Sequence, residues 1–84
     1  METIPVRLSA RGKRVAFSKH AAQALDNERP RIDEWDVARV LEEPDEDTPE
    51  NGARKRIGRR TIIVRYTQTE DEIQVRTVSA TRSA

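Results

Sequence analysis

Two segments in the second half of the chain are the clearest predicted β-strands. They are Thr61–Tyr66 and Ile73–Val78, both rich in the β-branched residues that favour extended structure. Only the polar residues 67–72 separate them, which predicts an antiparallel hairpin with 68–71 as a four-residue loop. With this loop, the expected cross-strand pairs are Tyr66 with Ile73, Val64 with Val75 and Ile62 with Thr77. Such pairs gather the apolar side chains on one face of a sheet, which helices are expected to cover.

Two helices are expected before this hairpin. Ser18 and Asp33 are good N-cap residues, and they introduce predicted helices over 19–28 and 33–42. The apolar residues of the second helix form one stripe at helical spacing, namely Val37, Val40 and Leu41. Trp35 lies near this stripe in the sequence, and we interpret it as a partly buried cover for the sheet.

Further strands are expected on either side of the helices. Ile4–Leu8, Arg14–Phe17 or both are predicted strands, separated by a turn signal at residues 11–13. Arg54–Ile57 is predicted to add a third strand to the hairpin. The expected fold class is therefore α+β, with an N-terminal strand, two helices and then a two- or three-stranded antiparallel sheet. At 84 residues, the chain is expected to form a single compact domain over residues 1–84.

Charge is strongly segregated along the chain. Residues 26–50 have a net charge of −8, whereas residues 51–66 have a net charge of +6 and contain no acidic residue. The segment 44–52 is acidic, contains two prolines and lacks large apolar residues, which predicts an acidic surface loop. Most of the basic residues are arginines, whose planar guanidinium binds phosphate and carboxylate groups alike. This pattern indicates either nucleic-acid binding or internal salt bridges.

The composition excludes several classes of protein. The chain has no cysteine and one histidine, which excludes disulfides and thiolate metal sites and makes a structural metal unexpected. No cofactor is predicted. No apolar run approaches the roughly 20 residues that span a bilayer, and the N-terminus lacks the layout of a signal peptide. We therefore predict no membrane association and a cytoplasmic location, and the sequence assigns no oligomeric state.

Three groups of residues, in order along the chain, carry a resemblance to a known family. They are Phe17-Ser18-Lys19-His20-Ala21, then Ile32, Val37, Val40-Leu41 and Pro44, and finally an arginine-rich hairpin that ends with Val75–Arg82. Over residues 15–82 this ordered set resembles an uncharacterised family related to the BrnT toxins, within the RelE-like superfamily. The resemblance implies a RelE/BrnT-like fold, metal-independent cleavage of RNA, and a protein antitoxin as the partner.

Two arginines of the hairpin are the main candidates for this chemistry. RNA is cut without a metal when its own 2′-hydroxyl attacks the adjacent phosphate, which requires charge stabilisation and proton transfer. Arg65 and Arg76 are expected to lie diagonally on the exposed sheet face, where forked hydrogen bonds would clamp the phosphate oxygens. The alternative interpretation is a pair of solvated surface arginines, one of them bound to Glu72.

One histidine is available for proton transfer. His20 lies in the first turn of the first predicted helix, and imidazole is the side chain best suited to acid or base catalysis near neutral pH. The alternative is a structural histidine, hydrogen-bonded to the backbone or to a carboxylate of the second helix. Its neighbour Lys19 is a candidate phosphate contact or a solvated lysine. Tyr66 lies on the apolar face by strand parity, so we assign it to the core and not to the site.

The basic segment before the hairpin is the remaining candidate site. Arg54 and Arg56 are predicted to contact the RNA backbone, and so is Arg82, although Thr81 displaces it from the arginine position of the family pattern. The alternatives are attraction to the acidic segment 45–50 and docking of an acidic part of an antitoxin. The leading hypothesis is thus an RNA-binding, metal-independent ribonuclease toxin of a toxin–antitoxin pair, and the alternative is a non-catalytic protein-interaction module.

Overall fold

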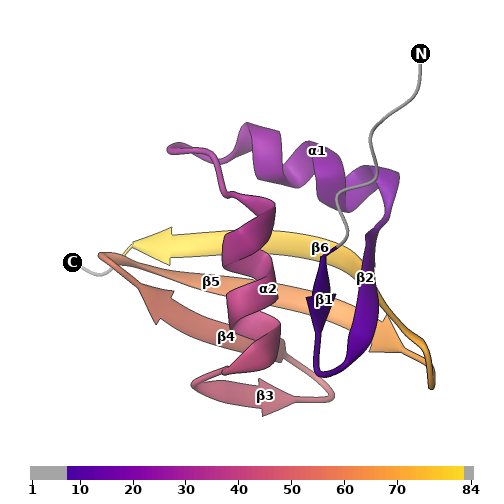
Figure 1. Cartoon of the computed structure of the whole chain (residues 1–84). Helices are drawn as coiled ribbons and strands as arrows, with labels where there is room; N and C mark the ends of the chain where they lie inside the picture. Colours follow the sequence, from indigo (N-terminus) through magenta and orange to yellow (C-terminus); the bar gives the residue numbers. More distant parts are fainter. Residues whose placement is uncertain (1–7, 83–84) are drawn as a thin grey trace.

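A six-stranded mixed sheet carries two short helices on one face in the computed structural model, which describes residues 8–82 (Figure 1). The strands are β1 (Ser9–Ala10), β2 (Lys13–Phe17), β3 (Glu46–Thr48), β4 (Gly52–Ile57), β5 (Arg60–Gln68) and β6 (Glu72–Arg82). The helices are α1 (Lys19–Asn27) and α2 (Glu34–Glu42). The sheet order is β1-β2-β6-β5-β4-β3, in which β2 and β6 are parallel and all other neighbours are antiparallel.

The predicted fold class was wrong. The prediction was an α+β fold of RelE/BrnT type with a two- or three-stranded sheet after the helices, but the protein is mostly β, with one curled six-stranded sheet. The hairpin and the third strand at Arg54–Ile57 are present, as β4 to β6. The prediction failed because the N-terminal strand β2 joins this same sheet beside β6, and because two short edge strands, β1 and β3, show no apolar alternation.

The N-terminal hairpin forms at the predicted turn. β1 pairs with β2 through a two-residue turn in which Arg11 and Gly12 have φ angles of 58° and 73°. Both residues therefore adopt the left-handed conformation that matches the twist of a tight hairpin. Most of the strand predicted over Ile4–Leu8 lies outside the described residues. Leu8, the one residue of that range within them, is buried just before β1.

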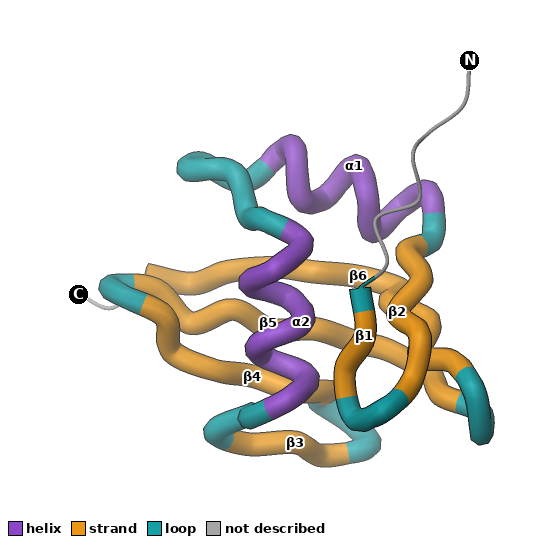
Figure 2. The backbone as a smooth tube through the Cα atoms, viewed as in Figure 1, coloured by secondary structure: helices purple, strands orange, loops and turns teal. Residues whose placement is uncertain are grey.

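Both helices begin at the predicted caps. The Ser18 side chain accepts a hydrogen bond from the backbone N–H of Ala21 at 3.0 Å, and Asp33 accepts one from Trp35 at 3.0 Å. This confirms the two N-caps, and the predicted helix ranges differ from the observed ones by one residue at an end. Figure 2 shows that both helices lie on the same face of the sheet, where α1 packs against β6 and β2 and α2 crosses β4 and β5.

The core lies between the helices and this face of the sheet. Its largest fully buried side chains come from both layers and are Leu25, Ile32, Val37, Val40, Leu41, Ile62, Val64, Ile73 and Val75. The apolar stripe predicted for the second helix is confirmed. The prediction that Trp35 covers the sheet was wrong, because its side chain is 59% exposed. Residues two apart on a helix do not share a face, so Trp35 points away when Val37 points inward.

The predicted register of the hairpin was also wrong. Tyr66 pairs with Val75 instead of Ile73, because the loop is shorter than expected and Gln68 is already paired with Ile73. The backbone N–H of Thr69 donates to the Glu72 carbonyl at 2.8 Å and closes this loop. A β-bulge then shifts the register once more, since Arg65 pairs with Thr77 and Arg76 is the extra residue.

The acidic segment 44–52 differs in part from the predicted surface loop. Most of its residues are exposed, but Glu46–Thr48 form β3, which pairs with the start of β4. The backbone N–H of Asp45 donates to the Arg54 carbonyl at 2.8 Å, and the Asp45 carboxylate accepts from the Arg56 N–H at 2.9 Å. The acidic segment thus lies along the basic strand that follows it in the sequence.

Candidate basic site at the β6 bulge

The β-bulge brings three polar side chains together on the sheet face opposite the helices. Val64 and Val75 are buried against the helices, so the side chains of Arg65 and Arg76, next to them in sequence, point to the opposite face. Because Arg76 is the extra residue of the bulge, both Arg76 and Thr77 lie opposite Arg65. The predicted proximity of the two arginines is thus present, but it arises from the bulge and not from the diagonal pairing that we expected.

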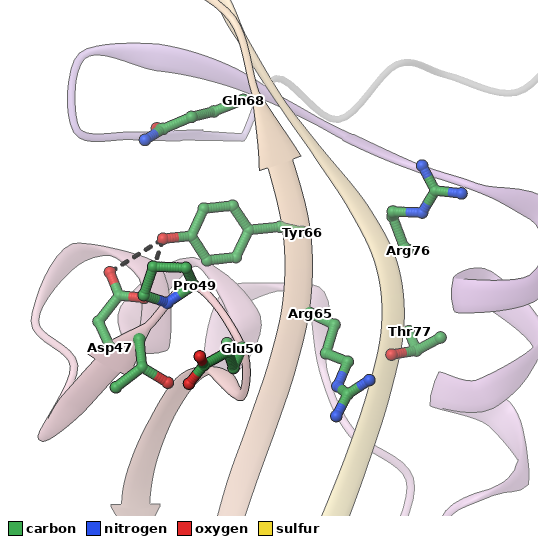
Figure 3. A pocket seen from close by; sticks show the side chains of 10 residues that line it. Asp47, Pro49, Glu50, Arg65, Tyr66, Gln68, Arg76 and Thr77 are labelled. Atoms are coloured by element: carbon green, nitrogen blue, oxygen red, sulfur yellow. Dashed lines mark hydrogen bonds between the residues drawn. The ribbon is translucent and has the colours of Figure 1, made fainter.

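Arg65, Arg76 and Thr77 line a cavity of about 680 Å³ (Figure 3). It forms where β4 begins at Gly52, so that β5 beyond Val64 is paired with β6 alone in the described part of the chain. The other lining residues come from the acidic segment and from the end of β5, and are Asp47, Thr48, Pro49, Glu50, Gly52, Tyr66 and Gln68. The cavity therefore has a basic side on β5 and β6 and an acidic side on the segment 47–50.

The two guanidinium groups are free for a ligand. Within residues 8–82, neither Arg65 nor Arg76 has a side-chain hydrogen bond or an ion pair. Glu72, which the alternative interpretation pairs with one of them, instead lies 3.6 Å from the Arg14 guanidinium. Figure 3 shows the Arg65 guanidinium beside Thr77, whereas that of Arg76 points away from it. The two groups therefore face different points along β6 and do not form a single fork.

A second cavity, of about 500 Å³, brings His20 close to the bulge. Its lining residues come from the end of β2, the start of α1 and β6, and are Ala16, Phe17, Ser18, His20, Gln74, Arg76 and Thr77. Arg76 and Thr77 thus line both cavities. The three residues predicted to be catalytic are placed in one region, since Arg65 shares a cavity with Arg76 and Arg76 shares the other with His20.

Ser18 holds the start of α1 against the bulge. Its backbone N–H donates to the Val75 carbonyl at 3.0 Å, and its hydroxyl donates to the Arg76 carbonyl at 3.2 Å. The same hydroxyl oxygen accepts the N-cap hydrogen bond from Ala21. The position of His20, two residues later, is therefore tied to the backbone of Arg76.

The residues predicted to contact RNA fall into separate regions. Lys19 is exposed at the start of α1 and lines neither of the two cavities. Arg54 and Arg56 are exposed on β4, on the same sheet face as Arg65. Arg54 lies 3.4 Å from the Glu46 carboxylate, which places an acidic partner beside it. Arg82 lies two residues after Ala80, which pairs with buried Ile62, so it belongs to the helix-covered face and is separate from this site.

A cluster of three polar side chains beside the first cavity was missed by the sequence analysis. The Tyr66 hydroxyl lies 3.0 Å and 2.9 Å from the two carboxylate oxygens of Asp47, and it accepts a hydrogen bond from Arg11 at 2.8 Å. Arg11 also forms an ion pair with Asp47 at 2.7 Å and donates to the Leu41 carbonyl at 2.6 Å. The cluster joins the first hairpin to β3, β5 and the end of α2, although Tyr66 was assigned to the core.

Tyr66 is held as a neutral phenol in this cluster. Burial, which is the largest cause, raises the pKa of Tyr66 above its ordinary value, and the neighbouring Asp47 carboxylate raises it further. The Arg11 guanidinium acts in the opposite direction. The phenol therefore serves as a hydrogen-bond donor to Asp47 and not as a base. The one available sequence signal was that a buried tyrosine hydroxyl needs a polar partner.

Comparisons with known proteins identify no relative, so the functional interpretation depends on the geometry of the site. No family model, no curated protein and no solved structure matches this chain. Within residues 8–82, neither helix has the length and apolar character needed to cross a membrane. In the same part of the chain, no group of three or more His, Asp or Glu side chains is placed to hold a metal ion.

Proposed function

We propose that this protein binds RNA at the β6 bulge and cleaves it without a metal ion. The observation that carries the proposal is the pair of arginines, Arg65 and Arg76, which line one cavity and have no protein partner within residues 8–82. Unpaired guanidinium groups in a cavity are well suited to phosphate oxygens, which accept forked hydrogen bonds. The resemblance of residues 15–82 to an uncharacterised family related to the BrnT toxins also motivates this activity, and it makes a protein antitoxin the partner that we propose.

The residues around the bulge supply the groups that such a reaction needs. The 2′-oxygen of the RNA forms a bond to phosphorus, and the bond from phosphorus to the 5′-oxygen of the next nucleotide breaks. The products are a 2′,3′-cyclic phosphate and a 5′-hydroxyl. Arg65 and Arg76 stabilise the negative charge that builds on the phosphate oxygens. His20 accepts the 2′-hydroxyl proton, and the leaving 5′-oxygen takes a proton from water.

A second candidate function is supported by the exposed side of α2. Trp35 is a large apolar side chain that is 59% exposed, and tryptophan is enriched among the residues that dominate binding at protein interfaces. The second candidate is therefore a non-catalytic protein-interaction module in which Trp35 is part of the contact surface. In that case the purified protein cuts no RNA, and Trp35→Ala weakens binding to a protein partner.

Expression in bacteria tests the ribonuclease activity. Wild type is expected to arrest growth and degrade total RNA, whereas Arg65→Ala/Arg76→Ala does neither. Arg39→Ala/Arg59→Ala is the matched control, because it removes two positive charges from exposed residues that line neither of the two cavities. Normal growth with intact RNA, when wild type is present in folded form, would contradict the ribonuclease activity.

Binding measurements at several salt concentrations test the phosphate contacts directly. Each phosphate contact to a single strand contributes about 0.7 to the slope of log affinity against log salt concentration. The Arg65→Ala/Arg76→Ala variant is therefore expected to lose about 1.4 from this slope. Equal slopes for this variant and for Arg39→Ala/Arg59→Ala would show that the two cavity arginines do not contact phosphate.

A further inference from the structure

We infer that the two cavities beside the bulge are adjacent nucleotide subsites for single-stranded RNA. This inference rests on the proposed function and names its substrate class. The two cavities share Arg76 and Thr77 and extend to opposite sides of β6. Their volumes of about 680 and 500 Å³ both lie within the range of small-ligand pockets. Two consecutive nucleotides would thus share the residues at the bulge.

Each cavity has an aromatic wall and polar groups suited to a nucleobase. Phe17 lines the second cavity and packs against the core, so its ring is held in place. The Gln74 amide nitrogen donates to the Glu72 carboxylate at 3.2 Å, which leaves the amide oxygen as an acceptor for a base. In the first cavity the Tyr66 ring is held by the hydrogen bonds to Asp47 and Arg11. Bases stack on such rings in single-stranded RNA recognition.

The charges of the first cavity determine the orientation in which a nucleotide would bind. Asp47 and Glu50 lie on one side of it and Arg65 and Arg76 on the other (Figure 3). Carboxylates repel a phosphate group but accept hydrogen bonds from the N–H groups of a base. The phosphate therefore lies on the arginine side, next to the bulge, and the base lies towards Asp47 and Glu50.

The separation of the cavities excludes a stacked double strand. One cavity is lined by β2 and the other by β5, and these strands are the two neighbours of β6 in the sheet. Strands two positions apart in a sheet are separated by about 9.5 Å. Neighbouring bases in a duplex are stacked about 3.4 Å apart. Two consecutive bases can occupy both cavities only when they are unstacked, and a single strand allows this.

Competition against a labelled single-stranded RNA tests the two subsites. The competitors carry 2′-O-methyl groups, which block cleavage, and are a mononucleotide, a dinucleotide, a trinucleotide and a duplex. The dinucleotide is expected to bind about ten- to a hundredfold more tightly than the mononucleotide, because it adds one stacked base. The trinucleotide is expected to bind only slightly more tightly than the dinucleotide. The duplex is expected to compete at least tenfold more weakly than the dinucleotide.

A variant of the second cavity separates the two subsites. Gln74→Ala is expected to reduce the gain in affinity from mononucleotide to dinucleotide. Gln23→Ala is the matched control, because Gln23 is exposed on α1 and lines neither cavity. Two results would overturn the two-subsite inference: equal binding of duplex and single strand, or an equal gain in affinity from mononucleotide to dinucleotide in Gln74→Ala and Gln23→Ala. Either result would leave the arginine-dependent binding of the proposed function in place. Failure of wild type to bind any RNA would instead overturn the proposed function, and the inference with it.

Discussion

Replacing Gly52 by alanine tests how closely β4 and β5 approach at the first cavity. Gly52 has a φ angle of +82°, and a Cβ atom built on it would lie 2.4 Å from the backbone oxygen of Val64. This oxygen belongs to a strand of the sheet and not to a flexible side chain, so the two strands must separate to accept the methyl group. The same change would also narrow the cavity beside Arg65, because Gly52 is one of its lining residues.

The expected loss of stability has two parts. A non-glycine residue in the left-handed conformation costs about 1–2 kcal/mol. Forcing a methyl group into a fully packed position typically costs about 1–3 kcal/mol more. The sum is about 2–5 kcal/mol, a large share of the roughly 4–13 kcal/mol expected for a chain of this length.

Gly58→Ala is the matched control for this measurement. Gly58 has a φ angle of +68° and lies in the turn after β4, but a Cβ atom there would meet nothing within 4 Å. Both variants incur the conformational cost and the change in unfolded-state entropy, so their difference reports the steric contact alone. Thermal unfolding followed by circular dichroism is expected to give Gly52→Ala a melting temperature at least about 4 °C below that of Gly58→Ala. Equal melting temperatures would refute the close approach of the two strands.

Three further predictions concern the contacts around the site. Ser18→Ala is expected to lower the free energy of unfolding by about 1 kcal/mol in urea denaturation, because α1 loses its N-cap. Tyr66 is the only tyrosine, so phenolate absorbance reports it alone, and its titration midpoint is expected above its ordinary value of 10.0. Because folding raises the pKa of Tyr66, the contribution of Tyr66 to stability is complete below pH 10. This contribution is lost as the pH rises through the pKa of the folded state. Denaturation at several alkaline pH values would show this loss. Glu46→Gln is expected to tighten RNA binding by up to about fivefold in anisotropy titrations, since it frees Arg54 from a surface ion pair.

Much of the local structure could be predicted from residue types and spacing. Ser18 and Asp33 were recognisable as caps because their short polar side chains reach the free N–H groups of a first helical turn. The buried stripe of α2 and the strands β5 and β6 followed from helical and alternating apolar periodicity, and Arg54–Ile57 was added to them as a third strand. The bulge also had a signal, because the buried residues Val75 and Val78 are three positions apart and strict alternation would place them on opposite faces.

The candidate site was less predictable than the elements that carry it. Arg65 and Arg76 were chosen as exposed strand arginines, and their shared cavity depends on the place where β4 begins. The link between His20 and Arg76 depends on Ser18, whose hydroxyl contacts a carbonyl 58 positions later in the chain. Arg11 and Asp47 carried no local signal, since a charged side chain in a turn or on a short edge strand is ordinarily solvated.

The helices, their caps, the C-terminal strands and the segregation of charge are all readable from the amino-acid sequence. These features depend on residues within a few positions of one another, so local propensity and periodicity are enough to specify them. Three features become evident only in the folded chain: β2 lies parallel to β6, the acidic segment pairs with β4, and one bulge joins two cavities. The pairing of β2 with β6 depends on hydrogen bonds between backbone groups far apart in the chain, and such groups are the same in every residue type except proline. A side-chain pattern can therefore indicate that a strand exists, but the packing of the whole chain selects its partner.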